Sequence, residues 1–308
     1  MKLIAIGECI HIISKDVKAA VESRDKAFIQ DLAKKQAQKG ARYLDLNIGP
    51  QKKAGHEVMP WMVQTIQEVT DLPLSLDTSN ATAIEAGLKV CKKKSLINST
   101  DATEERMNAM MPLAAKYNAN LISLTLAKGG LPTTADARIE LATERIFPAA
   151  AQHGVPIENL WLDPLVLTVN GNQDQAQQTI NAVRFFKQLA DPPPMTTCGL
   201  SNVSNQCPHE LRPLLNRVFL IMMAGAGLDS AILDPLDDDL MEVIRILETR
   251  DDSTPLGKLY LGIYDAYAAM EEFDTRSVDM SNPKLMEVAK TVNILQNKTL
   301  YAHGYLKL

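Results

Sequence analysis

The sequence predicts an α/β protein built as a (β/α)8 barrel, the TIM-barrel class, and three observations support this prediction. Eight short apolar runs alternate with longer stretches of helical periodicity, which is the strand and helix count of such a barrel. The runs are apolar at consecutive positions, as expected of strands that are buried on both faces. Each run passes directly into polar residues, and in a closed barrel these strand ends gather at one mouth.

An open, doubly wound sheet is the alternative architecture. Such a sheet normally carries a glycine-rich phosphate-binding turn after its first strand, and Gly7-Glu8-Cys9 is not a turn of that kind. The strand count and the spread of polar strand ends therefore favour the barrel.

The first strand, at 3–6, leads into a long predicted helix at 15–39. Ser14 and Asp16 are start signals for that helix, and Gly40 is its stop signal. The later strands are predicted from their apolar runs, at 43–46, 74–76, 95–97, 121–126, 160–162, 195–200 and 230–233. The helices between them are predicted from amphipathic periodicity, at 57–69, 81–90, 104–117, 135–152, 175–189 and 211–224.

The pattern changes after the eighth strand, where helices are predicted to open at Leu240 and Leu285. Between them, Thr254-Pro255 indicates an N-cap followed by proline at the first helical position. Apolar side chains then recur every three or four residues, at Leu256, Leu259, Ile263, Tyr267, Met270 and Phe273. We interpret this face as packed on the outside of the barrel, and a docking face for a partner or second subunit is the alternative.

Composition excludes several functional classes. The formal charge is −5, and no stripe of Lys and Arg with interleaved aromatic residues indicates nucleic-acid binding. The first apolar run is too short for a signal peptide, and no run approaches the ~18–20 residues of a transmembrane helix. The four cysteines are far apart without a CxxC pair, which indicates reduced thiols. We therefore expect a cytoplasmic protein that binds neither nucleic acid nor membrane.

The polar residues that follow the eight strands are the candidate site. They are Glu8, Asn47, Asp77, Asn98, Lys128, Asp163, Ser201 with Asn202, and Asp234. The set contains no histidine, so it predicts no zinc or iron site and no Ser–His–Asp triad. A glycine-rich phosphate loop is also missing from the sequence. A lone Asp or Asn in such a place can simply cap the next helix, and that interpretation stays open for Asp77, Asn98 and Asp163.

Carboxylates and carboxamides together suit a flat, uncharged heterocycle whose rim alternates donors and acceptors. A carboxylate accepts two parallel hydrogen bonds from the amino and N–H edge of a pterin, and an asparagine matches a mixed edge. Eight polar strand ends without an apolar exception favour a binding mouth of this kind over eight unrelated helix caps.

Five motifs strengthen this interpretation because they occur together and in order. They are Asp45-Leu46-Asn47-Ile48-Gly49-Pro50, Leu76-Asp77-Thr78-Ser79-Asn80, Ile97-Asn98-Ser99-Thr100, Leu162-Asp163-Pro164-Leu165 and Gly199-Leu200-Ser201-Asn202-Val203-Ser204. With these motifs the sequence resembles the methyltetrahydrofolate:corrinoid methyltransferases, most nearly those acting on the corrinoid/iron–sulfur protein of the acetyl-CoA pathway. The wider pterin-binding barrel family includes dihydropteroate synthase and the folate domain of cobalamin-dependent methionine synthase. The resemblance covers about 1–250 and resumes near 285.

The resemblance implies one pterin-binding barrel domain over 1–308, with a helical insertion at about 251–283 that shorter members lack. It implies SN2 transfer of the N5-methyl group of methyltetrahydrofolate to the Co(I) corrinoid (cobalamin) of a partner protein. It also implies a homodimer with no metal bound by the chain itself. Asn202 would act at N5 as the catalytic residue. The implied folate-binding residues are Glu8, Asp77, Asn98, Asp163, Gly199, Ser201, Asn202 and Arg212.

Two other functions remain open from the sequence. A dihydropteroate synthase must bind a pyrophosphate leaving group, and the acidic run from Asp234 to Asp239 would repel it. A non-catalytic folate-binding scaffold would present the same mouth, and only a transfer assay separates it from an enzyme.

Overall fold

The computed structural model describes residues 2–307, so Met1 and Leu308, the two ends of the predicted domain, lie outside it. Eight parallel strands form one sheet in the order β7-β6-β5-β4-β3-β2-β1-β8. The strands are β1 (Ile4–His11), β2 (Tyr43–Asn47), β3 (Leu74–Asp77), β4 (Leu96–Thr100), β5 (Asn120–Leu124), β6 (Leu160–Asp163), β7 (Met195–Thr196) and β8 (Ser230–Leu233).

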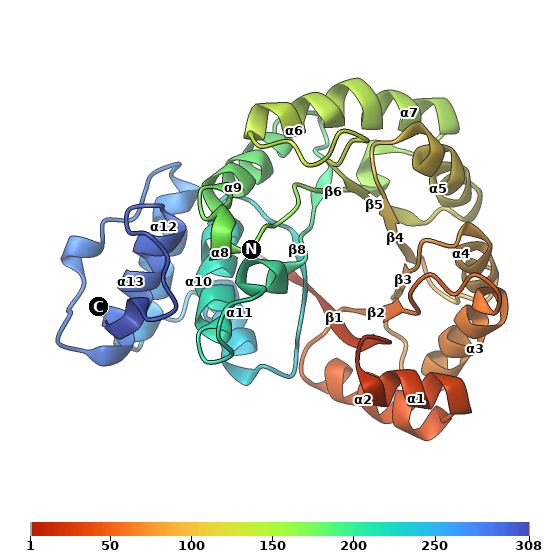
Figure 1. Cartoon of the computed structure of the whole chain (residues 1–308), viewed down its shortest axis with the longest axis horizontal. Coiled ribbons are helices and arrows are strands. Elements are labelled where there is room, and N and C mark those ends of the chain that lie inside the picture. The colour runs from red at the N-terminus through yellow and green to blue at the C-terminus, as the bar shows by residue number, and fades with distance from the viewer. Residues whose placement is uncertain (1, 308) are drawn as a thin grey trace.

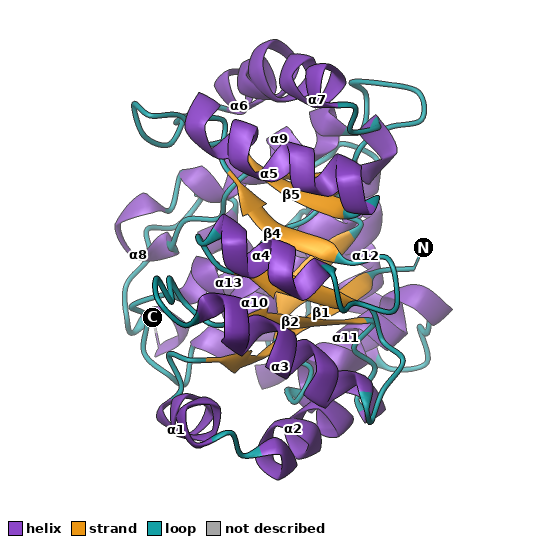
Figure 2. Cartoon of the chain, turned by 90° about the vertical axis from the view of Figure 1, so that its right-hand side faces the viewer, coloured by secondary structure: helices purple, strands orange, loops and turns teal. Residues whose placement is uncertain are grey.

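The barrel is nearly closed between β7 and β8. Gly199 forms a parallel bridge with Ile232, and the N–H of Ile232 donates to the carbonyl of Cys198 at 2.8 Å. The (β/α)8 class predicted from the sequence is therefore confirmed. Figure 1 shows the ring of strands with helices around it, and Figure 2 shows the strands enclosed by helices from the side.

The helices around the ring follow the strands in chain order. They are α1 (Lys15–Ser23), α2 (Lys26–Gln38), α3 (Gly55–Gln67), α4 (Ala81–Leu88), α5 (Glu104–Tyr117), α6 (Ala135–Leu141), α7 (Phe147–His153), α8 (Val169–Asn172), α9 (Gln175–Phe186), α10 (Arg212–Gly225) and α11 (Asp238–Thr249). Among residues 2–307, no helix is long and apolar enough to cross a membrane.

The predicted helix at 15–39 is wrong as a single element. Arg24 adopts a left-handed conformation with φ of 58°, and Asp25 then caps α2 by accepting from the N–H of Phe28 at 3.1 Å. The aspartate competes with helix continuation because it satisfies an N–H group at the start of the second helix. Ser14 does start α1, as predicted, through its bond to the N–H of Val17.

The predicted helix at 135–152 is also interrupted. A π-helical turn, Ala142–Ile146, separates α6 from α7, and Pro148 is the second residue of α7. Proline has no N–H to donate to the carbonyl four residues earlier, so the regular ladder cannot pass through this point.

The first and seventh strands also differ from their predictions. β1 runs on to His11 through a bulge between Gly7 and Ile10, so Glu8 lies inside the strand rather than after it. β7 is only Met195–Thr196, and a short 3-10 helix, Leu200–Ser204, replaces the predicted strand end.

The inner face of the barrel changes from apolar to polar along its strands. Tyr43 and Trp161 meet edge to face with ring centroids 5.6 Å apart, near the buried Ile6, Leu96 and Ile122. Two residues further along β2 comes Asp45, which is 4% exposed, and two residues beyond Trp161 comes the buried Asp163. Because side chains alternate along a strand, these carboxyl groups lie on the same inner face as the aromatic rings. The apolar layer therefore forms the base on which the polar layer rests.

The C-terminal part adds α12 (Pro255–Ala268) and α13 (Pro283–Leu295) outside the ring, beside α10 and α11 (Figure 1). Thr254 caps α12 through the N–H of Gly257, as predicted. Leu259, Ile263 and Tyr267 are buried in the core of the chain itself. For these residues the interpretation of packing on the outside of the barrel is confirmed. The predicted helical face is too long, because α12 ends at Ala268, whereas Met270, which is 67% exposed, and Phe273 lie beyond it.

Candidate functional site

A cavity of about 630 Å³ opens at the C-terminal ends of the strands. Cavities of this size are typical of sites for small organic ligands. The residues that line it are Glu8, His11, Ile13, Asp45, Asn47, Asp77, Asn98, Gly199, Ser201, Asn202, Asn205, Arg212 and Ile232.

The strand register places three predicted residues side by side in this cavity. Asn47 pairs with Asp77 across β2 and β3, and Asp77 pairs with Asn98 across β3 and β4. Asn47 donates a hydrogen bond from Nδ2 to Asp77, while its Oδ1 accepts from the N–H of Gly49 at 2.9 Å. Asn47 is thereby fixed, and it holds the Asp77 carboxyl group in one orientation.

Asp45 connects this row to the layer beneath. Its Oδ1 accepts from Nδ2 of Asn98 at 3.1 Å and from the hydroxyl of Ser75 at 2.5 Å. The sequence interpretation did not assign Asp45 to the site, although a charged residue inside the apolar run at 43–46 was a signal for it. Burial raises the pKa of both Asp45 and Asp77, and the charge of Asp45 raises that of Asp77 further. Such carboxyl groups become good acceptors once a ligand brings N–H donors to them.

Asp77, Asn98 and Asp163 do not cap the helices that follow them. The caps are Asn80 for α4, Thr103 for α5 and Thr168 for α8. The helix-cap interpretation, which the sequence left open, is therefore wrong for these three positions.

Asp163 does not line the cavity, although it lies on the inner face at the end of β6. It is 5% exposed, and its Oδ1 accepts from the N–H of Leu165 at 2.7 Å. Burial raises the pKa of Asp163 to about 7, and the nearby guanidinium of Arg138 opposes the rise. Arg138, on α6, is fully buried and donates to Oε1 of Gln175 at 3.0 Å. This buried cation is a second residue that the sequence interpretation missed.

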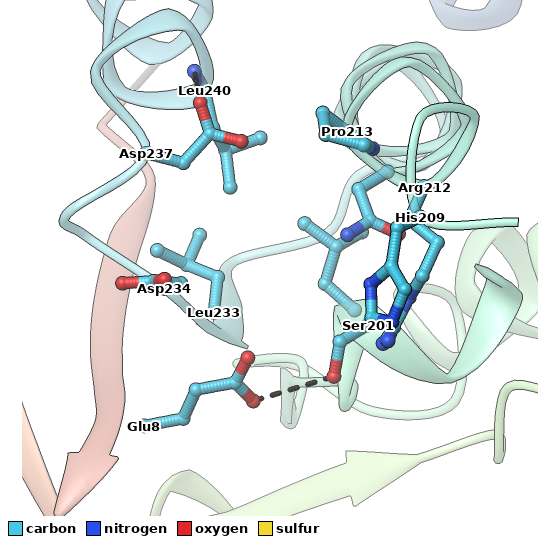
Figure 3. Close-up of a pocket in the computed structure, with 11 residues that line it drawn as sticks. Glu8, Ser201, His209, Arg212, Pro213, Leu233, Asp234, Asp237 and Leu240 are labelled. Carbon is cyan, nitrogen blue, oxygen red and sulfur yellow. Dashed lines mark hydrogen bonds between the residues drawn. The ribbon is translucent and has the colours of Figure 1, made fainter. Parts of the chain in front are cut away.

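Glu8 occupies the bulge of β1 and lines both this cavity and a smaller side cavity of about 250 Å³ (Figure 3). Its Oε2 accepts from the hydroxyl of Ser201 at 3.4 Å. Burial raises the pKa of Glu8 to about 7, with smaller contributions from the charges of Asp234 and Asp45. In Figure 3, Asp234 and Asp237 lie on one side of this side cavity, and Arg212 lies on the other.

The segment after β7 presents Asn202 at the rim, where its side chain is exposed. Oδ1 of Asn202 accepts from Nδ2 of Asn205 at 3.0 Å, which fixes the orientation of the amide. Arg212 begins α10 and donates from Nε to the hydroxyl of Ser204 at 3.4 Å. Gly199, Ser201, Asn202 and Arg212 therefore meet at one side of the cavity.

The expectation that all eight polar strand ends meet in one cavity is only partly right. Lys128 is exposed in its loop, Asp163 is buried and does not line the cavity, and Asp234 lines the side cavity. The expectation of no histidine at the mouth is wrong, because β1 continues to His11, which lines the cavity. Among residues 2–307, no three His, Cys, Asp or Glu side chains are placed to hold a metal ion.

The chain is similar to several known proteins. Residues 14–234 match the family of pterin binding enzymes. The chain is 30% identical to methylcorrinoid:tetrahydrofolate methyltransferase of Eubacterium limosum over 244 residues, 79% of this chain and 89% of that protein. It is 28% identical to methionine synthase of Mycobacterium tuberculosis over 89% of this chain, but it spans only 24% of that relative's length. Dihydropteroate synthase of Thermus thermophilus shares the fold, with a TM-score of 0.56, 17% identity, and coverage of 80% of this chain and 94% of the synthase.

Proposed function

Because this chain belongs to the family of pterin-binding enzymes, we propose that it transfers a methyl group between N5 of tetrahydrofolate and a corrinoid carried by a partner protein. The observation that supports this best is the fixed row of Asn47, Asp77 and Asn98 at the mouth. A relative that acts on methylcorrinoid and tetrahydrofolate, similar over 79% of the chain, supports the choice of reaction.

The row of side chains suits the edge of a pterin. The amino group and ring N–H of a pterin donate in parallel, and the Asp77 carboxylate, held by Asn47, accepts both. Asn98 offers a carboxamide beside it, whose Nδ2 is bonded to Asp45. We assign Asp163, at the end of β6, and Gly199 to the same ring. Because the pKa of Asp77 is raised, N–H donors of a bound pterin favour the ionised form of its carboxyl group. Folate binding is therefore coupled to release of a proton.

Methyl transfer needs help at N5, because an amine anion is a poor leaving group. In the direction toward the corrinoid, the bond from N5 to the methyl carbon breaks, the methyl group goes to Co(I), and N5 gains a proton. In the reverse direction N5 loses that proton as it takes the methyl group. We assign Asn202 to N5, since its amide stabilises developing charge without titrating itself.

Glu8, Ser201 and Arg212 complete the proposed site at the side of Asn202. Glu8, with its pKa raised to about 7, exchanges protons near neutrality and is bonded to Ser201, the neighbour of Asn202. Arg212 lines both cavities and places a positive charge there. The remaining contribution of the protein is to hold the folate with its methyl group toward the opening.

A dihydropteroate synthase reaction is less well supported. Pyrophosphate release needs an electropositive pocket, whereas Asp234 and Asp237 line the side cavity (Figure 3). The likeness to the Thermus thermophilus synthase, at 17% identity, supports the fold alone. The cytoplasmic location, the homodimer and the identity of the corrinoid/iron–sulfur partner remain proposals.

The test is single-turnover methyl transfer from methyltetrahydrofolate to free cob(I)alamin, followed by the absorbance of the two corrinoid states. The reverse reaction, from methylcobalamin to tetrahydrofolate, is measured in parallel. We expect transfer that depends on the protein and stoichiometric folate binding by calorimetry. Binding without transfer in either direction would indicate the folate-binding scaffold, and absence of both would contradict the proposal.

A further inference from the structure

One polar side chain at the mouth has no part in the proposed function. His11 ends β1 and lines the cavity of about 630 Å³. Its ring atom Nδ1 is buried and has no hydrogen-bond partner within residues 2–307. Buried polar atoms in folded proteins are nearly always paired, so an unpaired one at a ligand cavity calls for a partner from outside the chain.

The strand register places His11 in the row that carries the proposed pterin contacts. His11 pairs with Asn47 across β1 and β2, and the row continues through Asp77 to Asn98. Register partners on neighbouring strands lie at the same height and face the same side of the sheet. His11 is therefore a fourth member of this row.

Asn47, the register partner of His11, already has both ends of its amide engaged. Asn47 uses Oδ1 for the N–H of Gly49 and Nδ2 for Asp77, and Asn98 uses Nδ2 for Asp45. Two residues further along the chain, the side chain of Ile13 is 84% exposed and apolar, so it offers no hydrogen bond. No side chain within residues 2–307 bonds Nδ1, and a ligand in the cavity would supply that partner.

We propose that His11 is a further substrate-contacting residue, whose Nδ1 hydrogen-bonds a polar atom of the bound folate. The inference rests on the proposed function for the identity of the ligand. Imidazole serves this role in either tautomer, because Nδ1 donates in one and accepts in the other. A buried polar atom without a hydrogen bond destabilises the folate-free protein. A hydrogen bond from folate to this atom therefore contributes more to the binding free energy than one to an exposed atom.

The test uses three variants with different geometry. In His11→Asn the amide lies near the place of Nδ1, in His11→Gln it lies near the place of Nε2, and His11→Ala removes both. We expect tetrahydrofolate affinity, measured by calorimetry, to fall about tenfold in His11→Ala. His11→Asn should stay within about threefold of the wild type, and His11→Gln should resemble His11→Ala. His56→Ala is the matched control, since His56 is exposed beside Glu57 on α3.

Thermal unfolding of each variant separates loss of binding from loss of folding. If the wild type binds tetrahydrofolate and both His11→Ala and His11→Gln bind it with the same affinity, the role of His11 is overturned. The proposed function then still stands. Equal losses in all three variants would also overturn it, because a contact through Nδ1 distinguishes Asn from Gln. Absence of tetrahydrofolate binding in the wild type as well would overturn both proposals together.

Discussion

A methyl group on Gly199 would lie 2.9 Å from Nδ2 of Asn202, so any side chain at position 199 would push the amide away from the place it takes here. Asn205 holds the other end of the same amide through its bond to Oδ1 at 3.0 Å. The bond to Asn205 therefore orients the amide of Asn202, although this side chain is exposed. An amide fixed in advance stabilises charge in a transition state without a cost of reorganisation.

Replacing Asn202 by alanine should slow methyl transfer more than it weakens folate binding. The scale for one preorganised donor is a loss of ~10²–10³ in rate, because its interaction strengthens as charge develops. Single-turnover transfer and a tetrahydrofolate titration on the same preparation measure the two effects. Equal losses in both would make Asn202 a plain binding residue. Asn205→Ala should give a smaller loss of the same kind, since it loosens the amide without removing it.

Replacing Asp77 by alanine should weaken folate binding by about 1–3 kcal/mol and leave folding largely intact, because it leaves buried ligand donors unpaired. Asn80→Ala is the matched control three residues away. Asn80 caps α4 through the N–H groups of Thr82 and Ala83, so its loss should reduce the free energy of unfolding by about 1 kcal/mol. Folate affinity should not change in that control. The reverse pattern, with Asp77→Ala unfolding and Asn80→Ala losing affinity, would contradict the assignment.

Stability in the absence of folate should depend on pH through Asp163. Its pKa is raised to about 7 from an ordinary value of 3.8, so the folded state binds a proton more tightly than the unfolded state. The contribution of this proton to the free energy of unfolding is fully present below about pH 4 and is lost as the pH rises through about 7. Between pH 5 and pH 8, urea unfolding should show the wild type losing on the order of 2–3 kcal/mol more than Asp163→Asn. Parallel curves for the two proteins would rule out a neutral Asp163.

Arg138 should set the pH at which Asp163 becomes charged. Burial lowers the pKa of Arg138 to about 10, so the guanidinium remains positive near neutrality and opposes the rise at Asp163. In Arg138→Gln the pKa of Asp163 should rise further, so the loss of stability with rising pH, measured by urea unfolding, should shift to higher pH. Arg138→Lys keeps the charge and should restore the wild-type profile. An unshifted profile in Arg138→Gln would give this residue a packing role only.

Gly225 should be required for the contact between α10 and α12. A methyl group there would lie 2.5 Å from the carbonyl oxygen of Tyr264, which is closer than real atoms approach. Gly225→Ala should therefore reduce the free energy of unfolding by about 1–3 kcal/mol, with folate affinity unchanged. Gly129→Ala is the control, because a methyl group at that position meets nothing within 4 Å. Chemical unfolding of both variants checks the difference, and equal stabilities would show that α12 moves to make room.

The sequence alone determined the barrel and most of the residues at its mouth. Apolar runs without alternation, each ending in polar residues, are a local signal, because strands buried on both faces need apolar side chains at consecutive positions. The same signal placed Asn47, Asp77 and Asn98, each at or near the end of its strand. Start signals such as Ser14 and Thr254 are also local, since a cap bonds to N–H groups two or three residues away.

Only the tertiary structure decided which polar groups meet. The bulge in β1 carries the strand on to His11 and turns Glu8 toward Ser201, which is 193 positions away in the sequence. Arg138 on α6 comes close enough to Asp163 at the end of β6 for its charge to lower the pKa of that carboxyl group, and no spacing within the sequence encodes this proximity. Strand register and packing depend on interactions between distant segments, whereas strand ends and caps depend on neighbours. For that reason the kinds of residue at the site followed from the sequence, and their partners and charges followed from the fold.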